Sequence, residues 1–306
     1  HRVHLLSFAP LKKKKIKNVQ FHFLKNKISV KTRRISYLFN ILPNIIQVKR
    51  LLKSIRPDVL HAHEAVNYGR LAALTGFHPL IITPWGTDIL IKSEFKIQKP
   101  FTKFALRKPD LITCDGENIK RAMVEKFGVD PGRIVIIRFG VDTKRFRWMP
   151  KDEALAKQLG LSEAKTVISL RALARSHGVA TLIEAIPHIL KEIKRVKFII
   201  AGDPSYDPEY MEKIRTLMFS LRVKDAIIFL GQVSNEKLPA YFNLADVYVS
   251  TALSDSGLSS STAEAMACEL PVILSDSGDN AQWVQNGKGG FIVPCGDARP
   301  LAARII

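Results

Sequence analysis

Residues 247 to 275 read VYVSTALSDSGLSSSTAEAMACELPVILS and contain a strand pattern, a polar loop, a helix pattern and a second strand pattern, in that order. The apolar runs 247–251 and 271–275 are continuous rather than alternating, which is typical of strands covered on both faces. A strand–helix–strand order of this kind favours a parallel sheet. The stretch therefore predicts an α/β fold with doubly wound, Rossmann-like sheets.

The same alternation runs through the rest of the chain. Helical patterns, among them 34–54 and 117–127, separate further strand patterns at residues 3–8, 19–24, 59–63, 80–85, 111–114, 134–139, 166–170, 196–202, 226–231 and 291–294. The series pauses near residues 142–152 and restarts. We therefore predict two facing Rossmann-like domains, 1–145 and 146–306, with ligands beyond the carboxyl ends of their strands.

The polar loop of the opening stretch has two interpretations. A helix that starts near Ser261 offers unpaired N–H groups and the positive end of its dipole, and Gly257 would let an anion approach the backbone. Glu264 could then hold a vicinal diol such as ribose. Alternatively, Ser261 to Glu264 fits a capping box, in which the glutamate folds back onto the helix start. Local spacing alone leaves both open.

Charge is the unusual bulk property of this 306-residue chain, because 47 Lys+Arg against 28 Asp+Glu give +19. The excess gathers in the first third. A face of this kind could attract an anionic membrane surface or a phosphorylated acceptor, or could be a solvated surface without a partner. We expect no nucleic-acid partner, since no aromatic-interleaved basic motif accompanies the charge. The basic run that we expect to meet a membrane is Lys12, Lys13, Lys14 and Lys15.

Other features bear on the compartment and on cofactors. Three scattered cysteines, Cys114, Cys268 and Cys295, show neither a disulfide framework nor metal spacing, which indicates a cytoplasmic protein, peripheral at the inner face of a membrane if the basic run binds lipid. No dinucleotide or P-loop glycine motif occurs. No Asp-x-Asp pair offers oxygen ligands to a divalent cation. We therefore expect neither a metal nor a cofactor.

Residues 261–297, STAEAMACELPVILSDSGDNAQWVQNGKGGFIVPCGD, resemble the donor-site signature of retaining, family 4-type glycosyltransferases (glycosyl transferases group 1) with the GT-B fold. The resemblance continues through PDVLHAH, TPWGTD, LITCDGENI, IRFGVD and IIAGD, so it covers nearly the whole chain in order. It implies an acceptor-side first domain and a second domain that binds a nucleotide sugar. It also implies that further elements precede and follow these residues in the family.

The resemblance assigns roles residue by residue. It makes Glu264 the ribose ligand, and Arg171 the arginine that neutralises the departing diphosphate. His63 matches the first-domain histidine beside the reacting sugar. The remaining donor-site positions, which include the segment along the diphosphate and the glycine after strand pattern 196–202, are Ser256, Gly257, Leu258, Ser259 and Gly202.

Two positions depart from the family pattern. The family often has a glutamate eight residues before Glu264, where this chain has Ser256, and we expect Asp255 to take over the contact to the donor sugar. His177 stands where a lysine usually binds the diphosphate. A nearby diphosphate could raise the pKa of this imidazole and recover part of the charge.

The resemblance implies a retaining transferase that moves a hexose from a UDP- or GDP-sugar to the hydroxyl of an acceptor sugar, lipid-linked or polysaccharide. Two alternatives remain at this point. A sugar-nucleotide epimerase on the same fold would need acid and base carboxylates, for which Asp255 and Glu64 are the candidates. A non-catalytic sugar- or membrane-binding protein would explain the departures at Ser256 and His177.

Overall fold

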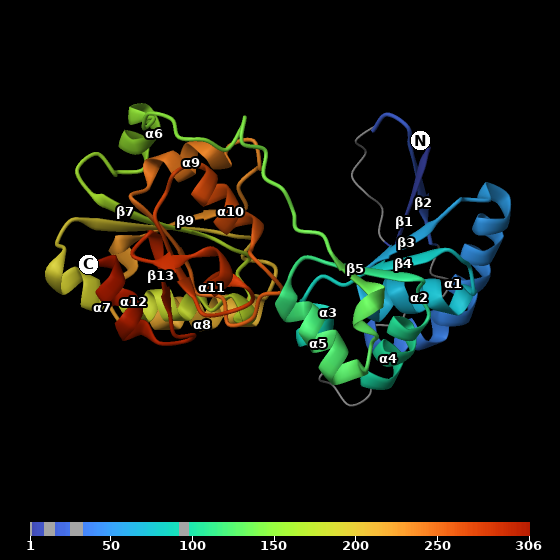
Figure 1. Cartoon of the computed structure of the whole chain (residues 1–306). Coiled ribbons are helices and arrows are strands. Elements are labelled where there is room, and N and C mark those ends of the chain that lie inside the picture. Colours follow the sequence, from blue (N-terminus) through green and yellow to red (C-terminus); the bar gives the residue numbers. More distant parts are fainter. Residues whose placement is uncertain (1, 9–15, 25–32, 92–97) are drawn as a thin grey trace. The chain divides into compact units, whose positions relative to one another are not determined.

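The computed structural model describes residues 2–8, 16–24, 33–91 and 98–306 of the chain (Figure 1). The chain divides into two compact units, and each is described by itself. Unit 1 comprises residues 1–114 and 122–135, and unit 2 comprises residues 115–121 and 136–306. The basic run Lys12 to Lys15 lies outside the described residues.

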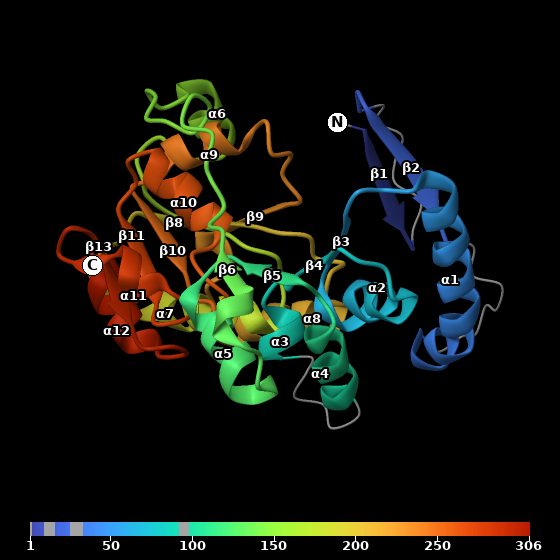
Figure 2. The same cartoon turned by 45° about the vertical axis from the view of Figure 1, so that its right-hand side comes forward.

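Unit 1 contains two sheets with helices packed against them. Strands β1 and β2 pair in parallel, and the second sheet has the order β3-β4-β5-β6. Helix α1 packs beside α2, as both views show (Figure 2). The elements of this part of the chain are β1 (Val3–Ser7), β2 (Val19–Phe23), α1 (Arg33–Ile55), β3 (Leu60–His63), π-helix η1 (Ala65–Gly69), α2 (Arg70–Thr75), β4 (Leu80–Thr83), α3 (Thr87–Leu90), α4 (Lys99–Arg107), β5 (Leu111–Cys114), α5 (Glu117–Phe127), 3-10 helix η3 (Pro131–Arg133) and β6 (Ile134–Ile136).

Unit 2 is built on one sheet with the strand order β12-β13-β11-β10-β7-β8-β9, in which β7 to β11 and β13 pair in parallel. Its elements are α6 (Glu153–Gln158), β7 (Lys165–Leu170), η4 (Arg175–His177), α7 (Val179–Glu192), β8 (Val196–Ala201), α8 (Pro208–Ser220), η5 (Lys224–Ala226), β9 (Ile227–Gly231), α9 (Leu238–Leu244), β10 (Val247–Ser250), α10 (Ser260–Ala267), β11 (Val272–Ser275), α11 (Asn280–Trp283), β12 (Gln285–Asn286), β13 (Gly289–Val293) and α12 (Ala298–Ile305).

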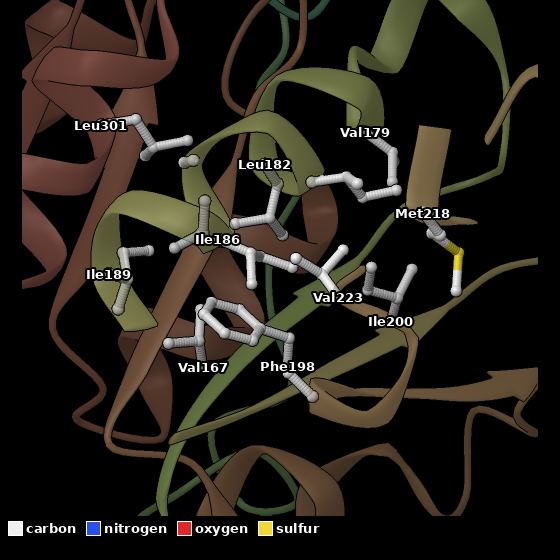
Figure 3. Packing of buried hydrophobic residues seen from close by; sticks show 14 of the residues in the cluster. Val167, Val179, Leu182, Ile186, Ile189, Phe198, Ile200, Met218, Val223 and Leu301 are labelled. Atoms are coloured by element: carbon white, nitrogen blue, oxygen red, sulfur yellow. The ribbon is translucent and has the colours of Figure 1, made fainter. Parts of the chain in front are cut away.

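Both faces of this sheet are covered, because successive strand residues point to opposite sides. Val167 and Phe198 point into a core shared with α7, α8 and α12 (Figure 3). Their neighbours Ile168 and Ile199 point into a second core shared with α6, α9 and α10. The continuous apolar strands of the sequence are therefore explained by burial on two sides, and the predicted doubly wound fold is confirmed.

Candidate active site

The strand order of unit 2 changes direction between β7 and β10, and this position is called the switch point below. From β7 it proceeds through β8 to β9, whereas from β10 it proceeds through β11 to β13. Open α/β sheets bind ligands beyond the carboxyl ends of the two strands at such a point, which here are the adjacent strands β7 and β10. Arg171 directly follows β7, and the loop 251–259 follows β10.

Two hydrogen bonds join the loops at this switch point. The Leu253 amide donates to the Ser176 carbonyl at 2.8 Å, and the Thr251 hydroxyl donates to the His177 carbonyl at 3.3 Å. Gly178 has a φ of 61°, and a Cβ there would lie 2.1 Å from the Thr251 carbonyl oxygen. Glycine is therefore required for both the turn and the close approach. The long helix α7 begins at the next residue, so its amino end lies at the switch point.

Arg171 and Asp255 form a buried ion pair. Arg171 Nη2 donates to Asp255 Oδ1 at 2.6 Å, and the two side chains are only 8% and 13% exposed. The other carboxylate oxygen, Oδ2 of Asp255, is buried and has no hydrogen-bond partner among the described residues. The cation expected at the diphosphate is therefore present at the switch point, and it is held by the carboxylate expected at the donor sugar.

His177 lies in the same loop, where burial disfavours its charged form. Its Nδ1 lies 2.8 Å from the Ala172 carbonyl, which can only accept, so Nδ1 carries the proton. Burial, followed by the nearby Arg171 charge, lowers the pKa of His177, although the Ala172 bond and Asp255 oppose the shift. In the neutral ring the remaining nitrogen Nε2 is thus an acceptor, and a bound anion would favour its protonation.

Ser256 contacts a carboxylate that the sequence interpretation missed. Its hydroxyl donates to Asp115 Oδ2 at 2.6 Å, and Asp115 Oδ1 is buried without a partner in the described part of the chain. Burial raises the pKa of Asp115, with smaller contributions from Asp279 and Asp255, while the Ser256 bond lowers it. The signal available in the sequence was the position of Asp115, immediately after the strand pattern 111–114.

The amino end of α5 is hydrogen-bonded to Asp279 and to the loop 251–259. Asp279 accepts from the Glu117 and Asn118 amides at 2.7 and 2.9 Å, and Asn118 Nδ2 donates to the Asp255 carbonyl at 2.8 Å. A Cβ at Gly257 would lie 2.9 Å from the Asp115 carbonyl oxygen. Gly257 is therefore needed for packing as well as for any approach of a ligand to the backbone.

Two other predicted donor-site residues, Gly202 and Leu258, have packing roles. A Cβ at Gly202 would lie 2.2 Å from the Arg171 carbonyl oxygen, so this glycine lets the end of β8 approach the Arg171 segment. The side chain of Leu258 packs against the core that α10 covers. Only the backbone of Leu258 can therefore contribute to a polar site.

Helix α10 starts differently from the capping box considered above. Its N-cap is Ser259, whose hydroxyl accepts from the Thr262 amide at 3.3 Å. Ser261 lies inside the first turn, where its hydroxyl bonds the Tyr248 hydroxyl at 2.8 Å. A capping box on Ser261 is therefore wrong, because Ser259 occupies the cap position and no bond joins Glu264 to the helix start.

The Glu264 carboxylate is available for a ligand. It accepts no hydrogen bond from any residue that the structure describes, and it is half-buried. Burial raises the pKa of its carboxyl, and the Arg145 charge partly opposes this shift. A polar group of a ligand, such as a ribose diol, would supply the missing donors.

In unit 1 the structure brings His63 together with Trp85. Trp85 Nε1 donates to His63 Nδ1 at 3.3 Å. His61 is hydrogen-bonded to the Thr83 hydroxyl at 2.6 Å. Asp88 lies inside α3, whose N-cap residue is Gly86. It is fully buried and accepts from the Ala65 amide at 2.6 Å and the Trp85 amide at 2.9 Å.

Comparison with known families gives two matches that together cover most of the chain. Residues 151–306 match the model described as glycosyl transferases group 1, and residues 1–116 match the model described as glycosyl transferase 4-like. The first match alone covers half of the chain.

Curated relatives carry related descriptions. The chain is 35% identical over 161 residues to a GDP-mannose-dependent alpha-(1-6)-phosphatidylinositol monomannoside mannosyltransferase of Mycobacterium tuberculosis, covering 50% of this chain and 41% of the relative. It is 26% identical over 297 residues to the putative glycosyltransferase EpsD of Bacillus subtilis, covering 92% of this chain and 75% of that protein. The chain thus spans less than half of the mannosyltransferase.

Solved structures show the fold. Anabaena Alr3699/HepE in complex with UDP-glucose superposes with a TM-score of 0.78 at 20% identity, covering 94% of this chain and 75% of that one. The sucrose-phosphate synthase of Thermosynechococcus elongatus superposes with a TM-score of 0.81 at 20% identity, covering 99% and 78%. These neighbours have the GT-B fold. The chain itself belongs to the family of glycosyl transferases group 1.

Proposed function

We propose that the chain is the core of a retaining glycosyltransferase that moves a hexose from a nucleoside diphosphate sugar to an acceptor hydroxyl. The observation that carries this proposal is the gathering of Arg171, the amino end of α7 and the 251–259 loop at the β7/β10 switch point. A helix amino end and a buried guanidinium both favour a diphosphate. Similar proteins support this donor class, since one is a GDP-mannose-dependent mannosyltransferase and another was solved in complex with UDP-glucose.

The proposed chemistry needs few residues. The bond between C1 of the hexose and the phosphate oxygen breaks, the acceptor oxygen bonds C1 on the same face, and the leaving phosphate takes the acceptor proton. Arg171 stabilises the negative charge that grows on the diphosphate, and no metal is required for that. Glu264 holds the ribose, Asp255 and Ser256 lie beside the donor sugar, and His63 lies beside the reacting sugar.

Within this proposal the residues 1–145 form the acceptor side and the residues 146–306 hold the donor. The acceptor is a sugar of a lipid-linked chain or polysaccharide, reached from the inner face of a membrane. Support comes from the net charge of +19 and from exposed basic residues on α1, which include Lys49, Arg50 and Lys53. No helix in the described ranges has the length and apolar character to span a bilayer.

A transfer assay tests the reaction. The chain is incubated with UDP- or GDP-hexoses, mono- and disaccharide acceptors and EDTA, and products are analysed by NMR for the configuration at C1. The proposal predicts a product that keeps the donor configuration and forms in EDTA. An inverted product, or transfer only after Mg²⁺ is added, contradicts the mechanism. Conversion of the sugar nucleotide without any acceptor would instead identify an epimerase.

A further inference from the structure

His63 and Trp85 lie at the carboxyl ends of neighbouring strands. His63 is the last residue of β3, and Trp85 comes two residues after the last residue of β4, Thr83, which is the register partner of His63. Trp85 Nε1 lies 3.3 Å from His63 Nδ1, with the two rings at 88° and their centroids 5.9 Å apart. The edge of the indole therefore meets one nitrogen of the imidazole.

A buried carboxylate holds the two loops in this arrangement. Asp88 accepts from the backbone amide of Ala65, two residues after His63, and from the backbone amide of Trp85. Asp88 is fully buried, so its two oxygens join the β3 loop to the β4 loop away from water. Gly86, with a φ of 95°, makes the turn between Trp85 and α3.

The pair has a chemical consequence, because an indole nitrogen can only donate a hydrogen bond. His63 Nδ1 must then be the acceptor, and the ring proton must lie on Nε2. We propose that Trp85 is a positioning residue that holds His63 as a neutral imidazole with its N–H at Nε2. The Nε2–H is then a hydrogen-bond donor for an oxygen of the substrate, and His63 is not the general base.

The surrounding titratable groups agree with a neutral His63. His61 on β3 has its ring centroid 4.2 Å from that of His63, so a charge on both rings is unfavourable. The carboxylate of Glu64 accepts from the Asn67 and Tyr68 amides at the start of η1, and that of Asp88 is held by Ala65 and Trp85. Both carboxylates are thus engaged by backbone N–H groups. Burial lowers the pKa of His63, and burial followed by the His63 charge lowers that of His61.

Protonation of His63 would place an N–H at Nδ1 opposite the indole N–H, and the hydrogen bond from Trp85 to His63 would be lost. The Trp85 contact therefore opposes protonation. The inference rests on the proposed function only where it gives Nε2 a substrate oxygen to bind. A neutral donor at that point would orient a substrate oxygen without removing the acceptor proton.

The test compares Trp85→Phe, which keeps an aromatic ring and removes the N–H, with the wild-type 306-residue chain. Trp148→Phe is the matched control, since the two tryptophans are 63% and 60% exposed. Long-range proton–nitrogen NMR spectra of protein labelled at histidine report which ring nitrogen is protonated, and His63→Gln identifies the signal. Thermal unfolding checks that each variant is folded.

We expect the wild-type His63 proton on Nε2, and in Trp85→Phe a rise of about half to one unit in the pKa of His63. At a pH above both values, the rate of transfer should fall by up to about twofold in the variant, because part of the neutral His63 then carries its proton on Nδ1 instead of Nε2. Trp148→Phe should change neither. A wild-type proton on Nδ1, or an unchanged His63 pKa in Trp85→Phe, overturns the inference. The expected spectra from a chain without transfer activity would support the inference and count against the proposed function alone.

Discussion

At the residue scale, Glu264 is the position where structure and proposed function meet most directly. Its carboxylate is half-buried, lacks a hydrogen-bond partner in the described residues and belongs to the helix that follows the 251–259 loop. Such a group stabilises a folded protein little, because burial penalises its charge, the Arg145 charge offsets only part of this penalty and no described residue donates a hydrogen bond to it. A ligand with two adjacent hydroxyls would offset it.

Glu264→Gln should therefore weaken ligand binding and raise the free energy of unfolding. Burial raises the pKa of Glu264, so the folded chain holds this proton more tightly than the unfolded chain. The free energy of unfolding then falls as pH rises through the ordinary and the raised pKa, and stays lower above them. The glutamine of the variant does not titrate, so this fall in the free energy of unfolding does not occur in it. We expect it to melt at a higher temperature than wild type at pH 7, with the difference gone below about pH 4.

Glu184→Gln, on the exposed face of α7, is the control for this comparison and should leave the melting temperature nearly unchanged. The binding of a nucleoside diphosphate should weaken at least about tenfold in Glu264→Gln and remain the same in Glu184→Gln. A melting temperature at pH 7 below that of wild type would contradict the account of Glu264 as an unsatisfied carboxylate.

The Arg171–Asp255 pair makes a second prediction at this scale. Breaking a buried pair leaves an uncompensated charge, so Arg171→Gln or Asp255→Asn alone should each lower the free energy of unfolding by about 3 kcal/mol. The double variant should lose clearly less than the sum. A denaturant double-mutant cycle measures the coupling.

The exposed pair Arg195–Glu163, whose side chains are 74% and 78% exposed, provides the control cycle. Its coupling should stay below about 1 kcal/mol. Equal coupling in the two cycles would show that the Arg171–Asp255 pair is not held in a low-dielectric environment.

At the scale of elements, the switch point depends on loops that approach too closely for side chains. Gly178 ends η4, adopts a left-handed conformation and faces the Thr251 carbonyl. Gly160 has a similar φ, 68°, but a Cβ there would meet no atom within 4 Å. The two glycines thus share the backbone conformation and differ in the space around them.

Gly160→Ala should cost about 1 kcal/mol of unfolding free energy, the strain of a left-handed alanine. Gly178→Ala should cost more, about 2 to 4 kcal/mol, because the methyl group also pushes β7 and β10 loops apart. Binding of a nucleoside diphosphate should weaken in Gly178→Ala alone. Equal losses of stability and unchanged binding in both variants would show that the close approach does not shape the site.

Most elements were predictable from the sequence, and the reason is burial. All twelve strand patterns occur as strands, and the central ones are continuous apolar runs because they are covered on both faces. Strands β1 and β2 are only partly buried, and their β-branched and aromatic residues made them predictable. The short strand β12, Gln285–Asn286, was not predicted, since two exposed polar residues carry no apolar pattern. The start of α10 was placed too late because Ser259, Ser260 and Ser261 are all good caps, and only tertiary contacts select one of them.

The site was predictable in outline only. The residues after β7 and β10 were expected at one edge of the sheet, because parallel strands bring their carboxyl ends together. The partners of those residues were not expected. Asp115 accepts from Ser256, which is 141 positions away, and Asp279 accepts from the Glu117 amide, which is 162 positions away, and no local pattern indicates such pairings.

At the scale of the whole molecule, the central claim is that the β7/β10 switch point of unit 2 binds a nucleoside diphosphate. Arg171, His177, Asp255 and Glu264 all belong to unit 2, and so do the contacts that position them. Nucleotide binding therefore depends on this unit's own sheet and loops, whatever the acceptor is.

The measurement that tests this claim most directly is calorimetric titration of the chain with UDP and with GDP in the presence of EDTA. The account predicts saturable binding of at least one of them, weakened at least about tenfold by Glu264→Ala and unchanged by Glu184→Ala. Absence of binding by the folded wild-type chain, or binding that survives Glu264→Ala in full, would contradict it.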